Sequence, residues 1–162
     1  MPIPNKYNTG YNIGVGGAVV DHGRLLMVRR ASRRGHGNWQ LPGGYIEPEE
    51  TIEQAVVREV FEEAGVKAEV DGIFAVRNRY DPDLGNGLYV VLVLHPTGNE
   101  PKPDGREVDR AEYLTLEEIE RLTPLPPINL EVARRVLAPD RRVLLPRTLS
   151  NLSGAKFTLF VG

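Results

Sequence analysis

The segment from Gly44 to Val66 places three glutamates on one stretch of a predicted helix, directly after a glycine-rich loop. Side chains three and four positions apart share a helix face, so Glu59 should lie beside Glu62 and Glu63. Carboxylates this close repel one another by about 0.2–0.5 kcal/mol per pair unless a cation lies between them. Mg²⁺ binds proteins through one or two carboxylates together with substrate phosphates. The segment therefore predicts a site for Mg²⁺ and a diphosphate.

The whole segment also follows a fixed pattern. Its letters fit G-x5-E-x7-R-E-U-x-E-E-x-G-U, where U is a bulky aliphatic residue. An isolated E-x-x-E-E run is more often a solvated helix face, but a chance match to the full pattern would arise in about one window in 10⁹. This pattern is the Nudix box. The chain resembles Nudix hydrolases from about Tyr11 to Leu137, including the approach Trp39-Gln40-Leu41-Pro42-Gly43-Gly44.

The resemblance implies roles for the residues of the box. The metal, Mg²⁺ or alternatively Mn²⁺, would be bound by the three glutamates and by the backbone carbonyl of Gly43. Glu50 and Arg58 would orient the metal-binding side chains and brace the loop at Gly44, although a surface ion pair would be worth only about 0–1 kcal/mol. The metal would activate a water molecule that hydrolyses a phosphoanhydride.

Two residues are candidates for the general base, because the family takes it either from the box helix or from a later loop. Glu59 is the candidate in the box. Glu107 is the loop candidate, and it has two alternative interpretations, as a further metal ligand or as a solvated loop residue. The base must reach the attacking water, which a sequence alone does not establish.

The substrate contacts are predicted from residue type. Guanidinium groups suit phosphate oxygens, and an aromatic ring can stack on a base. Each such residue has an ordinary alternative, a surface arginine or a core aromatic. The candidates are Arg29, Arg30, Trp39, Arg77, Arg79 and Tyr80.

The resemblance favours a small-molecule substrate in which a nucleoside diphosphate is linked to another moiety, with ADP-ribose preferred. Hydrolysis of (deoxy)nucleoside triphosphates is the close alternative. Pro82 resembles a proline of some ADP-ribose pyrophosphatases and Tyr80 a tyrosine of dinucleoside polyphosphate hydrolases, so these two residues together barely discriminate between those two groups. A non-catalytic nucleotide sensor is an alternative of a different class, but such domains commonly lose box carboxylates, and this chain has lost none. RNA decapping would need a connected basic track, for which only scattered arginines are candidates.

Composition narrows the class of protein further. The 162 residues have a formal net charge of −2, which disfavours nucleic acid as a partner. The absence of cysteine excludes disulfides and zinc thiolate sites, and it disfavours the Nudix-like isomerases that use a catalytic cysteine. No apolar run reaches membrane-spanning length and the N-terminus does not resemble a signal peptide, so we expect no membrane partner and a cytoplasmic location.

The predicted fold class is α/β (α+β), an α/β/α sandwich with a mixed central sheet. A hairpin is expected at Asp21-His22-Gly23, and capping signals place the box helix at about residues 52–64. Two strands are predicted on either side of Asp71-Gly72, and the run from Leu88 to His95 should be a central strand. Two further helices are expected, one capped by Thr115 and one spanning residues 129–137.

The predicted domain organisation has an N-terminal extension at residues 1–10, a Nudix hydrolase domain at 11–138 and a C-terminal tail at 139–162. Within the tail, Lys156 to Val161 has two alternative interpretations. It is either a strand that pairs with an exposed edge, for instance in a homodimer, or a disordered terminus.

Overall fold

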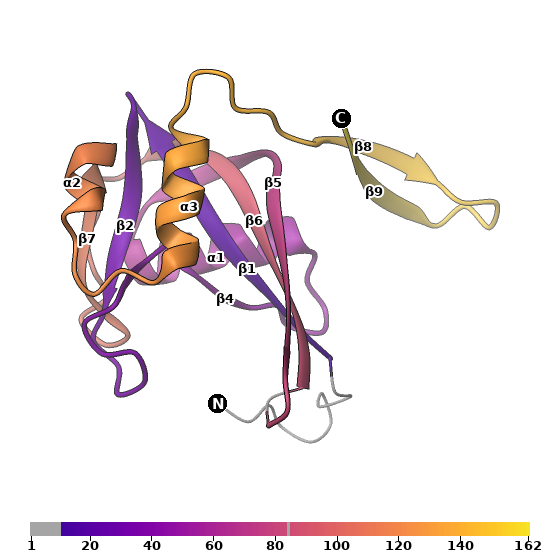
Figure 1. The fold of residues 1–162 in the computed structure, drawn as a ribbon. Coiled ribbons are helices and arrows are strands. Elements are labelled where there is room, and N and C mark those ends of the chain that lie inside the picture. Colours follow the sequence, from indigo (N-terminus) through magenta and orange to yellow (C-terminus); the bar gives the residue numbers. More distant parts are fainter. Residues whose placement is uncertain (1–10, 84) are drawn as a thin grey trace.

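The computed structural model describes residues 11–83 and 85–162, so the predicted N-terminal extension lies outside the described residues. The described chain forms an α/β/α sandwich, with helix α1 (Ile52–Ala64) on one face of a sheet and helices α2 (Leu116–Glu120) and α3 (Pro127–Val136) on the other (Figure 1). The predicted fold class is confirmed.

The central sheet has seven strands and is mixed. Its main order is β3-β2-β1-β6-β5, while β4 also pairs with β1, and β7 with β2. The β1–β6 pair is parallel, and the other pairs are antiparallel. The strands are β1 (Tyr11–Asp21), β2 (Arg24–Arg30), β3 (Trp39–Gln40), β4 (Gly43–Tyr45), β5 (Lys67–Asp81), β6 (Gly85–Gly98) and β7 (Val108–Leu114).

Two of the sequence predictions for the sheet are confirmed. The first hairpin turns at His22 and Gly23, whose φ angles of 48° and 73° suit the tight turns that match strand twist. Strand β6 lies between β1 and β5 and is buried on both faces, as the continuous apolar run from Leu88 to His95 indicated.

The prediction of two strands separated at Asp71-Gly72 is wrong. Strand β5 continues through these residues and shifts register against β6 there, between Val70 and Gly72. The glycine is needed for a close approach, because a Cβ at Gly72 would lie 2.4 Å from the carbonyl oxygen of Leu144. The Asp-Gly pair therefore marks a bulge in a strand and not a turn between strands.

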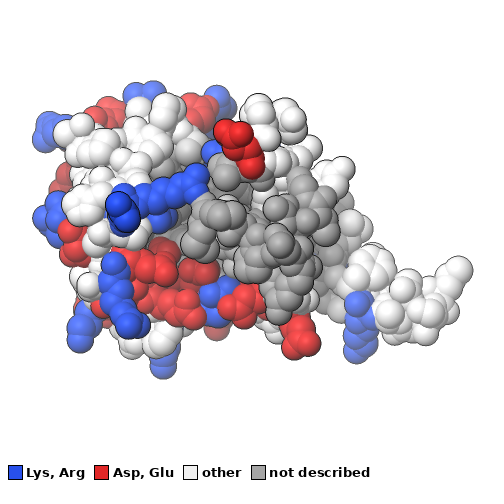
Figure 2. Space-filling view, turned by 90° about the horizontal axis from the view of Figure 1, so that it is seen from below, with Lys and Arg blue, Asp and Glu red and all other residues white. Residues whose placement is uncertain are grey.

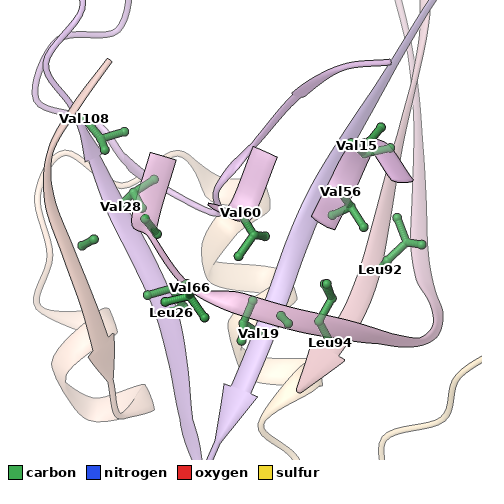
Figure 3. Close-up of a cluster of buried hydrophobic side chains, with 14 of the residues drawn as sticks. Val15, Val19, Leu26, Val28, Val56, Val60, Val66, Leu92, Leu94 and Val108 are labelled. Carbon is green, nitrogen blue, oxygen red and sulfur yellow. The ribbon is translucent and has the colours of Figure 1, made fainter. Parts of the chain in front are cut away.

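Helix α1 has the predicted bounds because its two ends are specified locally. The side chains of Thr51 and Gln54 each accept a hydrogen bond from the other's backbone N–H, which completes a capping box. Gly65 ends the helix in the left-handed conformation, with φ of 69°. Val56 and Val60 pack against the sheet in the first core (Figure 3). The helix is thus fixed at both ends and along its buried face.

The opposite face of the sheet holds a second core, which α2 and α3 cover. The two helices begin close to the predicted positions, after the capping box of Thr115 and Glu118 and after Pro126. Asn129 of α3 is buried, and its amide bridges the chain at Trp39 and Leu41. This contact holds the approach to the glycine loop against α3.

The C-terminal tail forms a two-stranded sheet of its own, from β8 (Leu145–Ser150) and β9 (Lys156–Val161). The strand predicted at residues 156–161 is present, and in this chain it pairs with β8. Figure 1 shows this hairpin projecting away from the sandwich. Leu144 and Ile73 join it to the edge of β5 through two backbone hydrogen bonds of 3.0 and 2.9 Å.

Candidate functional site

Arg58 on α1 connects the parts of the candidate site. Its guanidinium donates two hydrogen bonds to the Glu50 carboxylate, at 3.0 and 2.6 Å. It also donates to Glu59 at 2.8 Å, to Glu62 at 3.3 Å and to the carbonyl of Tyr45 at 3.3 Å. One side chain thereby links the loop before α1, strand β4 and two box glutamates.

The Glu50 carboxylate also fixes the loop that leads into α1. Its Oε1 accepts a hydrogen bond from the backbone N–H of Glu47 at 2.8 Å. The hydrogen bonds from Arg58 lower the pKa of Glu50, and those to Glu50 raise the pKa of Arg58. Both groups therefore remain charged, as a bidentate ion pair requires.

Glu63 is the most buried acidic side chain in the described chain, with 4% of the residue exposed. Burial, followed by the nearby charge of Glu59, raises its pKa to about 8. Burial also raises the pKa of Glu59, against the opposing effect of Arg58. Only one described hydrogen bond reaches the Glu63 carboxylate, from the backbone N–H of Gly43 at 3.2 Å. Glu63 is thus a buried carboxylate beside a second, partly buried carboxylate, Glu59.

Two glycines allow the loop to approach this pair. A Cβ on Gly43 would lie 2.1 Å from the carbonyl oxygen of Val15, and one on Gly44 would lie 2.5 Å from a carboxylate oxygen of Glu59. Strand β4 is consequently held against β1 on one side and against the α1 carboxylates on the other. Any other residue at Gly43 would displace the loop from β1, and one at Gly44 would displace the Glu59 carboxylate.

Glu62 and Glu107 are the two further glutamates near Glu59 and Glu63. The Glu62 side chain is exposed and directed to Arg58. Glu107 is on the loop before β7, which the Asp104 carboxylate holds by accepting three backbone hydrogen bonds, and its charge acts on both buried glutamates. Within residues 11–83 and 85–162, no three carboxylate or imidazole groups converge closely enough to form a ready metal cluster.

A cleft of about 340 Å³ lies on the other side of the glycine loop. Both Gly43 and Gly44 line it, so the cleft and the buried carboxylates share this loop. Three of the predicted substrate residues line it as well: Arg30, Arg77 and Arg79. The structure therefore brings these three arginines close to the box.

Arg77 has an unusual environment in the cleft. Its guanidinium carbon lies 5.0 Å from the centroid of the Tyr89 ring, and burial lowers its pKa. Its Nε is buried and makes no hydrogen bond within the described chain. A buried donor without an acceptor is costly, which makes this atom a candidate to meet a ligand.

The structure does not bring Arg29, Trp39 and Tyr80, the other predicted substrate residues, to this cleft. Arg29 forms a bidentate pair with Asp109 at 2.7 and 2.9 Å. Trp39 is buried in the second core, with the guanidinium groups of Arg29 and Arg110 about 6.0 and 5.8 Å from its ring. Tyr80 is 72% exposed, on the sheet face opposite the cleft.

The sequence interpretation did not select several residues that line the cleft. Tyr89 looked like part of an apolar strand, although it has a polar group and alternates with the residues of the first core. Asn129 offered a clearer signal, because a polar residue on the apolar face of a helix needs a partner when it is buried. The remaining residues of this set with a polar group are Asn12, Gln40 and Tyr45.

Acidic and basic side chains are separated from one another on one face of the molecule. Figure 2 shows a group of acidic side chains there, with basic side chains on its borders. An acidic surface with a basic border can attract a divalent cation and a phosphate together. The described residues contain no helix that is both long and apolar enough to cross a membrane.

Comparison with known proteins decides the family. The model of the NUDIX domain matches residues 10–136, which is most of the chain. The chain belongs to the Nudix family. The recognition made from the Gly44–Val66 pattern is thereby confirmed.

Among curated relatives of this Nudix chain, a MutT-like protein of Streptomyces ambofaciens is 36% identical over 74% of the chain and 75% of its own length. The ADP-ribose pyrophosphatase of Methanocaldococcus jannaschii is 32% identical, over 68% of the chain and 65% of the relative. The human nucleoside diphosphate-linked moiety X motif 6 protein is 32% identical over 78% of the chain. The chain spans about two fifths, 42%, of the length of this human protein and of its mouse counterpart.

Solved structures agree with this assignment. A MutT Nudix hydrolase from Burkholderia pseudomallei has a TM-score of 0.68 at 26% identity, covering 78% of this chain and 98% of the other. The Nudix domain of Shewanella oneidensis NrtR, crystallised with ADP-ribose, has a TM-score of 0.66 at 21% identity, covering 84% of this chain and 94% of the other. The latter likeness concerns the fold alone.

The buried Glu63 predicts a measurable effect on stability in the absence of metal. The pKa of Glu63 in the folded protein is above its usual value. The contribution of Glu63 to stability is therefore fully present below about pH 4.5 and is lost as the pH rises toward about 8. We expect Glu63→Gln to stabilise the chelator-treated protein at pH 8 by about 1–2 kcal/mol, or roughly 3–6 °C in Tm. Thermal unfolding followed by circular dichroism would measure this.

The matched control for this comparison is Glu112→Gln, at a half-exposed carboxylate on β7 that pairs with Arg110 at the surface. It should leave the Tm unchanged at both pH 4 and pH 8. A Glu63→Gln protein that is less stable than the wild type at pH 8 would contradict the conclusion that burial of the charged Glu63 carboxylate destabilises the metal-free protein.

Proposed function

We propose that this chain hydrolyses a phosphoanhydride bond in a nucleoside diphosphate that is linked to another moiety, with ADP-ribose as the favoured type of substrate. The observation that carries the proposal is the position of the Gly43–Gly44 loop, between the pair Glu59 and Glu63 and the arginine-lined cleft. A substrate that spans this loop would have its diphosphate beside the carboxylates and its organic part in the cleft.

The donor set fits Mg²⁺ or Mn²⁺. All the groups available are oxygens, and a site for Mg²⁺ needs only one or two carboxylates when substrate phosphates supply further ligands. Glu59, Glu63 and the carbonyl of Gly43 would hold the ion, and Glu62 would join them when its side chain turns away from Arg58. When bound, the metal neutralises the diphosphate and lowers the pKa of a coordinated water.

The chain's own groups would orient the reaction. Arg58 holds one Glu59 oxygen at 2.8 Å and is itself held by Glu50, so the direction of the Glu59 carboxylate is fixed before any ligand binds. The burial of Glu63 limits water around its carboxylate, which strengthens its electrostatic contact with a bound cation. These residues are positioning and binding groups in the proposal.

The contacts favour Glu107 over Glu59 as the general base. Arg58 already occupies an oxygen of Glu59, which leaves this carboxylate less free to turn toward an attacking water. Glu107 lies on a loop close enough for its charge to act on both buried glutamates. It could therefore reach a water that sits above them.

The cleft supports a sugar-linked diphosphate. Its volume of about 340 Å³ suits a nucleoside-sized group. Arg77 and Arg79 add positive charge on the side away from α1, where a second phosphate oxygen or a polar sugar would lie. The relative named ADP-ribose pyrophosphatase, at 32% identity, is consistent with this preference.

The proposal predicts the products of a substrate panel with Mg²⁺, analysed by chromatography. ADP-ribose should yield AMP and ribose 5-phosphate faster than other nucleoside diphosphate sugars, dinucleoside polyphosphates or nucleoside triphosphates are cleaved. Glu62→Gln should lower kcat by a factor of roughly 10²–10⁴ with the fold intact, since its side chain is exposed.

Each alternative has a distinct outcome in this panel. A nucleoside monophosphate with pyrophosphate, formed faster from triphosphates, would replace the favoured substrate with the nucleoside triphosphate alternative. Metal-independent binding of nucleotides with no turnover, unchanged in Glu62→Gln, would identify a sensor and overturn the enzymatic proposal. Glu117→Gln, at an exposed carboxylate on α2, is the matched control.

Arg58 should matter more for catalysis than for stability. We expect Arg58→Lys to lose the bidentate contact with Glu50 and to reduce kcat by roughly 10- to 100-fold, while ΔG of unfolding falls by only about 1 kcal/mol. Steady-state kinetics and urea unfolding would measure the two effects. A variant with wild-type kcat would show that Glu59 keeps its orientation without this contact.

A further inference from the structure

The C-terminal hairpin has an apolar face that nothing in the described chain covers. Opposite residues in an antiparallel pair share a face, and β8 and β9 are in register from Leu145 with Val161 to Ser150 with Lys156. The apolar residues of the hairpin face are Leu145, Leu149, Phe157, Leu159 and Val161, each 44–51% exposed, and Arg147 lies among them opposite Leu159. An isolated two-stranded hairpin is marginally stable in water, so this face needs a partner.

The sandwich has a second uncovered apolar area, on three neighbouring strands. The sheet strip consists of Tyr11, Ile13, Val76, Tyr80 and Leu88, each 40–72% exposed. Register places them on one face of β1, β6 and β5, the same face whose other residues pack against α1. Two sheets can pack face to face through surfaces of this kind.

The hairpin cannot reach the sheet strip of its own chain. Leu144 pairs antiparallel with Ile73, so the chain beyond Leu144 runs toward Gly72 and away from Val76 and Tyr80. Figure 1 shows the hairpin leaving the sandwich at the end of the sheet opposite to the β5–β6 turn. A partner molecule must therefore supply the surface that covers the hairpin face.

Net charge favours packing of the hairpin on residues 1–138 of a second copy, here called the body, over packing on a second hairpin. The tail at residues 139–162 contains four basic residues and one acidic residue, and is therefore positive. The first 138 residues contain 16 basic and 21 acidic residues, and are therefore negative. Two tails would repel each other, whereas a tail and a body attract.

The size of the interface leads to the same choice. Each hairpin face exposes on the order of 400 Å² of apolar side chain. Two hairpins packed on each other would bury about 800 Å² in total, which is typical of crystal packing. Two symmetric contacts between hairpin and strip would bury about 1,600 Å², within the range of stable dimers.

We propose that the chain forms a homodimer by exchange of arms, in which the hairpin face of each copy packs on the sheet strip of the other. The partner surface is thus a second copy of this chain, related by a two-fold axis. This inference goes beyond the proposed function and does not depend on it, because it rests on residues outside the carboxylate site.

Sedimentation equilibrium over a range of protein concentrations tests the dimer. The wild type should be dimeric at micromolar concentration. Leu159→Glu in the hairpin face and Val76→Glu in the sheet strip should each raise the dimer dissociation constant roughly tenfold or more. Thr158→Glu, at the neighbouring position on the opposite hairpin face, is the matched control and should remain dimeric.

Cross-linking provides a second test that does not depend on the glutamate variants. Because the chain lacks cysteine, Leu159→Cys and Val76→Cys chains can be mixed and treated with a short bis-maleimide. A mixed dimer should form, and Thr158→Cys in place of Leu159→Cys should reduce its yield. A monomeric wild type, or a dimer that survives Val76→Glu, would overturn the proposal.

Discussion

The arrangement of the candidate site depends on the contacts of Arg58 with Glu50 and Glu59. A buried carboxylate is costly unless a positive charge or a hydrogen bond compensates it, and Arg58 compensates Glu59 while Glu50 fixes Arg58. Glu63, which lacks such a guanidinium partner among the described contacts, has the pKa most strongly raised of the box glutamates. The site therefore combines one neutralised carboxylate with one that a cation would stabilise.

The sheet and the helix supply the rigid framework for this pair. Val56 and Val60 hold α1 to the sheet, and Gly17 allows the close contact, since a Cβ there would lie 2.6 Å from a methyl group of Val60. The glycine loop is fixed from the other side by its pairing with β1. This packing fixes the distance between the carboxylates and the cleft that share the loop. A fixed distance matters because catalysis is sensitive to displacements of about an ångström.

The sequence was sufficient for features that are specified locally. The bounds of α1 followed from Thr51, Gln54 and Gly65, because caps act on neighbouring residues. The bulge at Gly72 could not be distinguished from a turn, since the contact that requires a glycine there is with Leu144, which is distant in the chain.

The substrate residues show where sequence information was available but unused. Side chains alternate along a strand, so Arg77 and Arg79 share one face of β5 while Tyr80 belongs to the other. This alternation separates the two arginines in the cleft from the exposed tyrosine. In contrast, the burial of Trp39 and the pairing of Arg29 with Asp109 depend on which strands become neighbours. These contacts are tertiary and could not be read from local pattern.

The central claim is that Glu59 and Glu63 are held ready for a divalent cation, and metal binding tests it most directly. Metal-free protein would be titrated with Mn²⁺, and the signal of the free ion followed by electron paramagnetic resonance. We predict that the wild type removes this signal and that Glu59→Gln and Glu63→Gln each weaken binding, whereas Glu112→Gln does not. Equal binding by the wild type and both site variants would contradict the account.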